Sequence, residues 1–187
     1  MGTDWDKRYR EGFYAGPFEA HSLVRRFYPL IPRDKPVIDI AMGPGADLLF
    51  LARKGLRVSG LERSREAIKV ARESAEEAQT ALPMVQGDAG RLPFKPAVAG
   101  CVLVFYFLAR EIMADLSGLL APGGLLIYET FLKGQNAVDR PRNPAYLLED
   151  GELQSYFPDL DLLFYEEGLF TVNGKRRALA RYAGSKR

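Results

Sequence analysis

Two glycines and a carboxylate at short spacing are the residues of this chain best suited to bind a nucleoside. Gly43 and Gly45 enclose a proline in a tight turn, and glycines let a ligand approach the main chain because they carry no Cβ. Glu62 follows Gly45 by 17 residues (62 − 45), and a carboxylate at that point can accept hydrogen bonds from both hydroxyls of a ribose. The three residues together predict a nucleoside site.

The segments around these residues predict a strand–helix–strand unit. Residues 37–41 are a short apolar run typical of a strand buried on both faces. Residues 46–54 have helical spacing and end at Gly55, and residues 57–61 form the next strand. In the dinucleotide fingerprint a third glycine would fall at position 48, which is Leu48, so an NAD-dependent oxidoreductase is disfavoured.

The full pattern from Asp39 to Glu62 resembles motif I and the acidic motif of class I S-adenosylmethionine-dependent methyltransferases. The turn of that family commonly reads Asp-x-Gly-x-Gly-x-Gly, so Ala41 and Met42 depart from it. We expect Met42 to narrow the pocket near the methionine end of the cofactor. Residues 84–94 resemble the family's third strand and acidic loop, in which Asp88 would accept from the adenine amine and the amide of Ala89 would donate to the ring. Residues 120–127 match its Leu-x-Pro-Gly-Gly turn.

The start of the chain resembles the small bacterial methyltransferases of the tellurite-resistance and thiopurine type. The segment from Trp5 to Tyr9 matches their Trp-x-x-Arg-Tyr start, and in those relatives it closes over the cofactor. The resemblance implies S-adenosyl-L-methionine as cofactor and S-adenosyl-L-homocysteine as product. It places these residues at the cofactor: Trp5, Tyr9, Asp39, Ala41, Met42, Gly43, Gly45, Glu62, Arg63, Asp88, Ala89 and Phe105.

Alternation of strands and helices predicts a single doubly wound, Rossmann-like α/β domain. We expect a seven-stranded, mostly parallel sheet with one antiparallel strand from a C-terminal hairpin, residues 160–168 and 175–183, joined through Asn173-Gly174. The predicted domain contains an N-terminal helical and aromatic lid (1–30), a cofactor-binding core (37–130) and a substrate-side loop with the hairpin (131–187). Helices are predicted at 64–79, 111–120 and 149–157, and further strands at 99–107 and 125–130.

Composition agrees with a single compact enzyme of 187 residues. The net charge of +2 gives no electrostatic case for binding nucleic acid or an anionic membrane. Cys101 is the single cysteine, so no internal disulfide is expected. No signal peptide and no apolar run of membrane-spanning length are found, so a cytoplasmic monomer or homodimer is expected.

The acceptor is predicted by elimination to be a small molecule. Residues 105–110, after the fourth strand, lack both the Asn/Asp-Pro-Pro-Tyr motif of amino-group methylases and the Asp ligands of magnesium-dependent enzymes. Tyr106, Arg110 and His21 are the catalytic candidates. His21, the single histidine, could be a general base or a surface or capping residue. Thr130, Arg140 and Arg142 are the substrate-binding candidates, although a solvated polar loop would also explain the two arginines.

We therefore expect metal-independent methyl transfer to a small soft or anionic acceptor, achieved mainly by proximity and orientation. The alternative is a module with the methyltransferase fold that binds the cofactor or a partner protein without turnover, since fold does not fix function.

Overall fold

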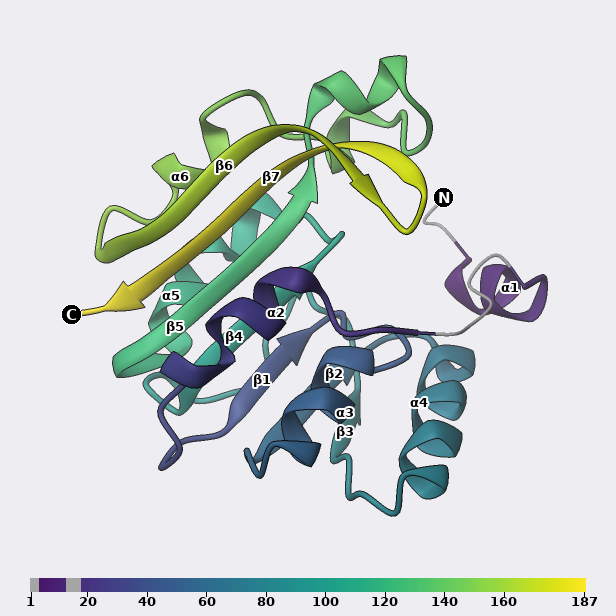
Figure 1. Cartoon of the computed structure of the whole chain (residues 1–187), viewed down its shortest axis with the longest axis vertical. Helices are drawn as coiled ribbons and strands as arrows, with labels where there is room; N and C mark the ends of the chain where they lie inside the picture. The colour runs from purple at the N-terminus through teal and green to yellow at the C-terminus, as the bar shows by residue number, and fades with distance from the viewer. Residues whose placement is uncertain (1–3, 13–17) are drawn as a thin grey trace.

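The protein has one seven-stranded sheet with helices on both faces (Figure 1). The computed structural model describes residues 4–12 and 18–187. Its strands are β1 (Val37–Ile40), β2 (Val58–Glu62), β3 (Met84–Gln86), β4 (Ala99–Phe105), β5 (Leu120–Phe131), β6 (Leu160–Val172) and β7 (Lys175–Lys186). The α-helices are α1 (Trp5–Arg10), α2 (Ser22–Phe27), α3 (Ala46–Arg53), α4 (Arg65–Glu77), α5 (Met113–Leu119) and α6 (Glu152–Ser155). Short 3-10 helices are η1 (Tyr28–Leu30), η2 (Arg110–Ile112), η3 (Lys133–Ala137) and η4 (Pro144–Tyr146).

The strand order is β3-β2-β1-β4-β5-β7-β6. Strands β1 to β5 are parallel, and β7 runs antiparallel to both of its neighbours, β5 and β6. The predicted fold class, a mostly parallel sheet with one antiparallel strand, is therefore confirmed. In such a sheet the carboxyl ends of the parallel strands share one edge, where ligands bind.

The C-terminal hairpin is longer than the sequence predicted. Its two strands reach Val172 and Lys186, and Asn173 and Gly174 both have positive φ (50° and 73°), as a type I′ turn requires. The pairing of β5 with β7 ends at Phe131 and Leu179. The hairpin tip therefore extends past the end of β5, as Figure 1 shows for the yellow ribbon.

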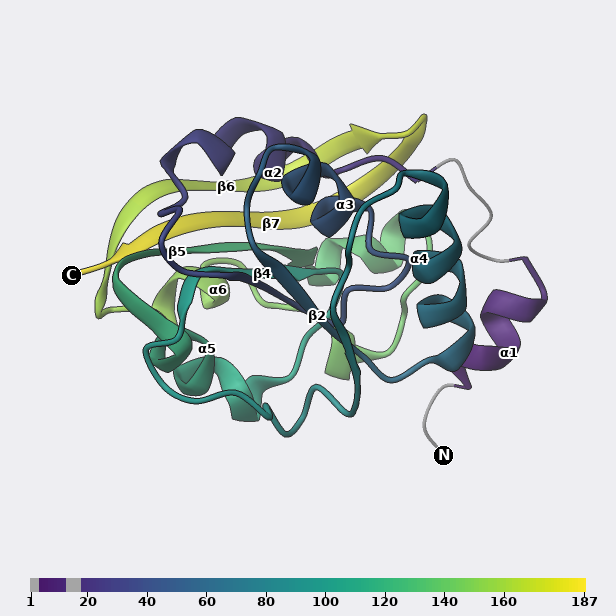
Figure 2. The same ribbon diagram turned by 90° about the horizontal axis from the view of Figure 1, so that it is seen from below.

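Two apolar layers enclose the sheet because the buried strands are apolar on both sides. Helices α2, α3 and α4 pack against Val37, Cys101 and Leu103, whereas α5 and α6 pack against the opposite face, at Val102 and Val104. Figure 2 shows the sheet edge-on between these layers. Side chains two apart in β4 thus share a face, which decides below which residues of β4 and β5 reach the site.

Capping and turn residues in the sequence predicted the ends of some helices correctly and those of others incorrectly. Ser64 caps α4 as predicted, its hydroxyl accepting from the amide of Ala67 at 3.2 Å. The helix expected at 149–157 is reduced to α6, which follows Gly151 in a left-handed conformation (φ 78°). In the lead segment, α1 and α2 are helical as expected, and residues 13–17 lie outside the described residues. None of the helices in the described ranges is long and apolar enough to cross a bilayer.

Candidate active site

The glycine turn and Glu62 form one hydrogen-bonded unit at the carboxyl edge of the sheet. Ala41, Gly43 and Gly45 all have positive φ (58°, 54° and 75°), so the chain reverses tightly after β1. The Glu62 carboxylate accepts from the amide of Gly43 at 3.0 Å and from the amide of Ser64 at 2.8 Å. Each carboxylate oxygen keeps a further lone pair, so Glu62 can hold the turn and still accept from a ribose.

Met42 is buried and packs into the core. A Cβ built on Gly60 in β2 would lie 2.0 Å from the Met42 sulfur, so the methionine side chain occupies the space above that glycine. The expectation that Met42 narrows the cofactor pocket is therefore wrong. Its main chain still belongs to the turn, because its carbonyl accepts from the amide of Gly45 at 3.1 Å.

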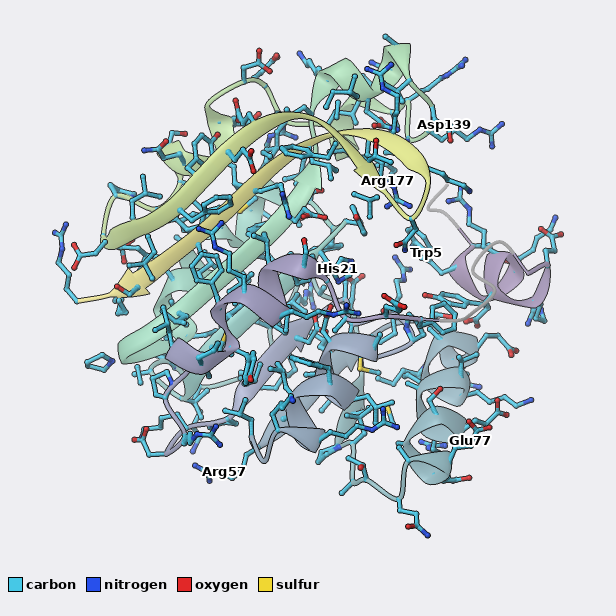
Figure 3. All side chains as sticks on the ribbon, in the orientation of Figure 1. Trp5, His21, Arg57, Glu77, Asp139 and Arg177 are labelled. Carbon is cyan, nitrogen blue, oxygen red and sulfur yellow. The ribbon has the colours of Figure 1, made fainter. Side chains whose placement is uncertain are left out.

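Helix α1 packs against this turn and is held there by a hydrogen bond. The carboxylate of Asp6 accepts from the Ser64 hydroxyl at 2.6 Å, and this hydrogen bond is the main cause that lowers the pKa of Asp6. A Cβ on Gly43 would come within 3.0 Å of the Tyr9 hydroxyl, so Tyr9 lies directly against the turn. Trp5, labelled in Figure 3, begins the same helix, and the Arg8 guanidinium lies 5.3 Å from its ring centroid.

The end of β3 carries the residues predicted to bind adenine. Asp88 is exposed, and one of its oxygens accepts from the amide of Gly90 at 3.0 Å, while the other has no hydrogen-bond donor among the described residues. Ala89 is buried beside it. Arg63 is exposed, and its carbonyl accepts from the side chain of Gln86 at 3.2 Å.

Three buried acidic side chains, those of Asp39, Asp47 and Glu62, lie close to one another on the cofactor side of the site. Burial raises the pKa of Asp39 well above its usual value, and the charges of Asp47 and Glu62 raise it further. Within the described ranges no lysine or arginine forms an ion pair with Asp39, Asp47 or Glu62. The side chain of Asp47 contacts the ring of His21 instead. A cationic ligand would relieve this repulsion, and S-adenosylmethionine, with its ammonium and sulfonium groups, fits that requirement.

His21 and Asp47 form a pair that the sequence did not predict. The Asp47 carboxylate accepts from the His21 backbone amide at 2.7 Å, and its other oxygen lies 2.6 Å from the ring Nδ1. The ring stacks on Phe105 with centroids 3.9 Å apart and meets the edge of Tyr106 at 5.3 Å. With Nδ1 held by Asp47, Nε2 is the ring nitrogen left for chemistry. The sequence feature that could have indicated this pair is Asp47, an acidic residue in the first turn of the helix that follows Gly45.

Tyr106 lies just past β4 in a strained conformation, with φ 54°. Its ring stacks on Phe131 at 5.1 Å, and the guanidinium carbon of Arg177 lies 4.7 Å from the ring centroid. Its hydroxyl is buried without a hydrogen-bond partner among the described residues. Burial mainly raises the pKa of Tyr106, the charge of Glu129 raises it further, and the charge of Arg177 opposes both.

Two of the predicted acceptor-side residues have other roles. Arg110 donates to Glu152 at 2.6 Å and 3.0 Å and to the carbonyl of Leu147 at 2.9 Å, so its guanidinium joins η2 to α6. Thr130 is buried and has the strand parity of Tyr128, which places it on the face of the sheet opposite Glu129. The structure therefore does not bring Arg110 or Thr130 to the acceptor side of the site.

The loop after β5 leaves the sheet at its carboxyl edge and returns to the same place. The amide of Lys133 donates to Leu148 and the amide of Leu148 donates to Phe131, both at 2.9 Å, so the two ends of the loop meet. Buried Gln135 donates to the carbonyl of Arg140 at 3.0 Å and accepts from the amide of Ala178 at 2.8 Å, which ties the loop to β7.

The three cations of this loop differ in their partners. Lys133 contacts Glu149, whereas Arg140 and Arg142 are exposed, and no ion pair of either is found in the described part of the chain.

Residues 37–124 match the protein family described as a methyltransferase domain. Hemagglutinin 1 from Eikenella corrodens is 27% identical over 82% of this chain and 53% of its own length. A 23S rRNA (uracil(747)-C(5))-methyltransferase from Pyrococcus abyssi is 30% identical over 65% of this chain and 30% of its own length. The chain thus spans about half or less of these two curated relatives.

Similarity to solved structures extends over nearly the whole chain. The crystal structure of TehB from Haemophilus influenzae superposes with a TM-score of 0.74 at 18% identity, covering 97% of this chain and 66% of that one. At this identity the likeness shows the fold, a mixed sheet with helices on both faces.

Proposed function

We propose that the protein transfers the methyl group of S-adenosylmethionine to a small soft or anionic acceptor, because residues 37–124 match the family described as a methyltransferase domain and the chain has the fold of TehB. The observation that carries the proposal is the Glu62 unit: a buried carboxylate, fixed by the amides of Gly43 and Ser64, at the end of the strand next to the glycine turn.

Hydrogen-bond acceptors and buried acidic side chains support the proposed binding of the cofactor. Glu62 would accept from the ribose hydroxyls, and the open oxygen of Asp88 would accept from the adenine amine. Asp39 and Asp47 would interact with the positive groups of the methionine portion of the cofactor, since both are buried and neither has a lysine or arginine partner in the described ranges. Tyr9 and Trp5 on α1 would close the site above the turn.

S-adenosylmethionine would supply an activated methyl group, because its positive sulfur is already a good leaving group. Methyl transfer therefore needs little chemistry from the protein. The residues of this chain would therefore position the acceptor and exclude water. Tyr106 and Phe131 would form the aromatic wall against which the acceptor packs. A neutral thiol or hydroxyl acceptor would lose its proton to Nε2 of His21, whose ring orientation is fixed by Asp47 and Phe105.

Metal independence is part of the proposal. In residues 4–12 and 18–187 no three His, Cys, Asp or Glu side chains are grouped so that they could hold a metal ion. The aromatic side chains that follow β4 and the single histidine bound to Asp47 suit an acceptor activated by a base.

The first test is calorimetric titration with S-adenosylhomocysteine and, separately, with NAD. Binding of the first and not of the second supports the cofactor assignment, and the reverse refutes it. The second test is release of S-adenosylhomocysteine from S-adenosylmethionine with small thiols and oxyanions, compared with RNA and protein. Efficient methylation of RNA or protein refutes the small-acceptor proposal, and tight cofactor binding without turnover on any acceptor favours the non-catalytic module.

His21→Asn tests the base. The asparagine keeps a polar side chain next to Asp47 but cannot take a proton. We expect a fall in kcat that is large for a thiol of high pKa and small for one already ionised at the assay pH, with unchanged cofactor affinity. An equal effect on both thiols would contradict the role of His21 as a proton acceptor.

A further inference from the structure

Arg177, at the base of the hairpin tip, is a cation at the site without a counter-ion. In the described part of the chain no carboxylate lies within 4.0 Å of its guanidinium. Its guanidinium carbon lies instead 4.7 Å from the ring centroid of Tyr106 and 6.0 Å from that of Phe131. Figure 3 labels Arg177 on the hairpin, where it extends past the end of β5.

Glu129, the acidic residue near Arg177, is paired with Arg181 and not with Arg177. Arg181 donates to buried Glu129 at 3.0 Å, forms a second ion pair with Glu166 at 3.4 Å, and donates to the hydroxyl of Ser22 at 2.7 Å. Among the described residues Arg177 is therefore left without a carboxylate in direct contact.

A second unsatisfied group lies against Arg177. The Tyr106 hydroxyl is buried without a hydrogen-bond partner among the described residues. Such a donor gains a hydrogen bond if a ligand oxygen reaches it. A planar guanidinium and a phenol hydroxyl are together the donors that a carboxylate takes up, since arginine can bind both of its oxygens.

The surroundings restrict the body of the ligand. The rings of His21, Tyr106 and Phe131 lie next to one another, at centroid distances of 5.3 Å and 5.1 Å. The loop that carries Arg140 is joined to the residue after Arg177 by Gln135, so further positive charge is held near the hairpin. A flat organic acid suits this wall better than a spherical ion.

We propose that Arg177 and the Tyr106 hydroxyl bind the carboxylate of a planar organic acceptor. The inference rests on the proposed function and deepens it, because it assigns the acceptor's chemical class. It also divides the site: buried acidic side chains lie on the side of the cationic cofactor, and the guanidinium of Arg177, which has no ion-pair partner among the described residues, faces the anionic acceptor.

The chain contains a matched control for this arginine. Arg176 carries the same charge one residue earlier in β7, is exposed, and has the opposite strand parity, so its side chain points to the other face of the sheet. Arg177→Ala and Arg176→Ala change net charge equally, and only the first alters the proposed site.

The test is calorimetric titration of the protein with benzoate, with and without saturating S-adenosylhomocysteine, and with benzamide as the uncharged probe. We expect benzoate to bind and benzamide not to bind. Arg177→Ala should weaken benzoate at least tenfold, Tyr106→Phe several-fold, and Arg176→Ala less than twofold. Arg177→Lys, which keeps the charge but not the planar donor pair, should fall between wild type and Arg177→Ala.

The outcomes separate this inference from the function on which it rests. Absent benzoate binding to wild type, equal losses in the two alanine variants, or equal binding of benzamide would overturn the carboxylate site even if S-adenosylhomocysteine binds. Binding of benzoate that depends on Arg177 in a protein that does not bind S-adenosylhomocysteine would support the anion site and refute the methyltransferase proposal. Far-ultraviolet circular dichroism and melting temperatures establish that each variant is folded.

Discussion

Replacing Glu62 by alanine should affect the cofactor site and the fold together. Its carboxylate accepts from the amides of Gly43 and Ser64, at 3.0 Å and 2.8 Å, and it is 7% exposed. Removal of the carboxylate leaves two backbone amides at the turn without their acceptor, so the free energy of unfolding should fall as well as the cofactor affinity.

The magnitude follows from the number and type of bonds lost. A hydrogen bond to a charged group contributes about 1.5 kcal/mol at the lower end of its range. Two such bonds within the protein predict a loss of about 3 kcal/mol in the free energy of unfolding. Two bonds to ribose hydroxyls would cost a similar amount on binding, which corresponds to an increase of roughly a hundredfold in Kd.

The assay measures both quantities on the same preparations. Guanidinium unfolding followed by circular dichroism gives the free energy of unfolding, and calorimetry with S-adenosylhomocysteine at 20 °C gives Kd. Glu73→Ala is the control, because Glu73 is an exposed glutamate of α4 whose ion pair with Lys69 is 3.9 Å long. That variant should match wild type in both measurements.

A Glu62→Ala protein that is folded at 20 °C and binds S-adenosylhomocysteine within threefold of wild type would show that Glu62 does not hold the ribose. An unchanged free energy of unfolding would show that the two amide hydrogen bonds do not stabilise the turn.

Three further predictions address packing, pH and metals. Gly60→Ala should lower the free energy of unfolding by about 1–3 kcal/mol, because the new Cβ meets the Met42 sulfur, and adding Met42→Ala should restore part of the loss in a denaturant series. The hydrogen bond from Arg110 mainly lowers the pKa of Glu152 to about 2 from an ordinary 4.5, so its stabilisation is present above pH 4.5 and lost as the pH falls toward 2. The free energy of unfolding should therefore fall more steeply between pH 5 and 3 in wild type than in Glu152→Gln, and equal slopes would contradict this. A chelator should leave both turnover and melting temperature unchanged, and a loss that magnesium or zinc restores would disprove metal independence.

Sequence reasoning succeeded where the signal is local. Gly123 and the Asn173-Gly174 pair have the positive φ that their turns require, and Ser64 caps its helix because the cap is defined by residues three positions apart. The strand–helix–strand unit likewise predicted that Glu62 lies at the end of the second strand, and it is the last residue of β2.

It failed where the proposed site depends on residues that are distant in sequence. His21 and Asp47 are 26 positions apart, and Arg177 contacts a ring 71 positions earlier (177 − 106), so only the folded sheet brings them together. Arg110 was misassigned because nothing local shows that Glu152, 42 positions later, accepts from its guanidinium.

The closed loop between Leu132 and Leu148 has a consequence for how acceptor preference can change in evolution. Backbone hydrogen bonds join its two ends, so the residues between them leave the sheet and return to the same point. The cost of closing such a loop grows slowly with its length, so insertions and substitutions there would be tolerated without disturbing β5 or β7. Loops could be exchanged between enzymes of this fold at Leu132 and Leu148, with Gln135 retained as the anchor, to pass acceptor specificity from one chain to another.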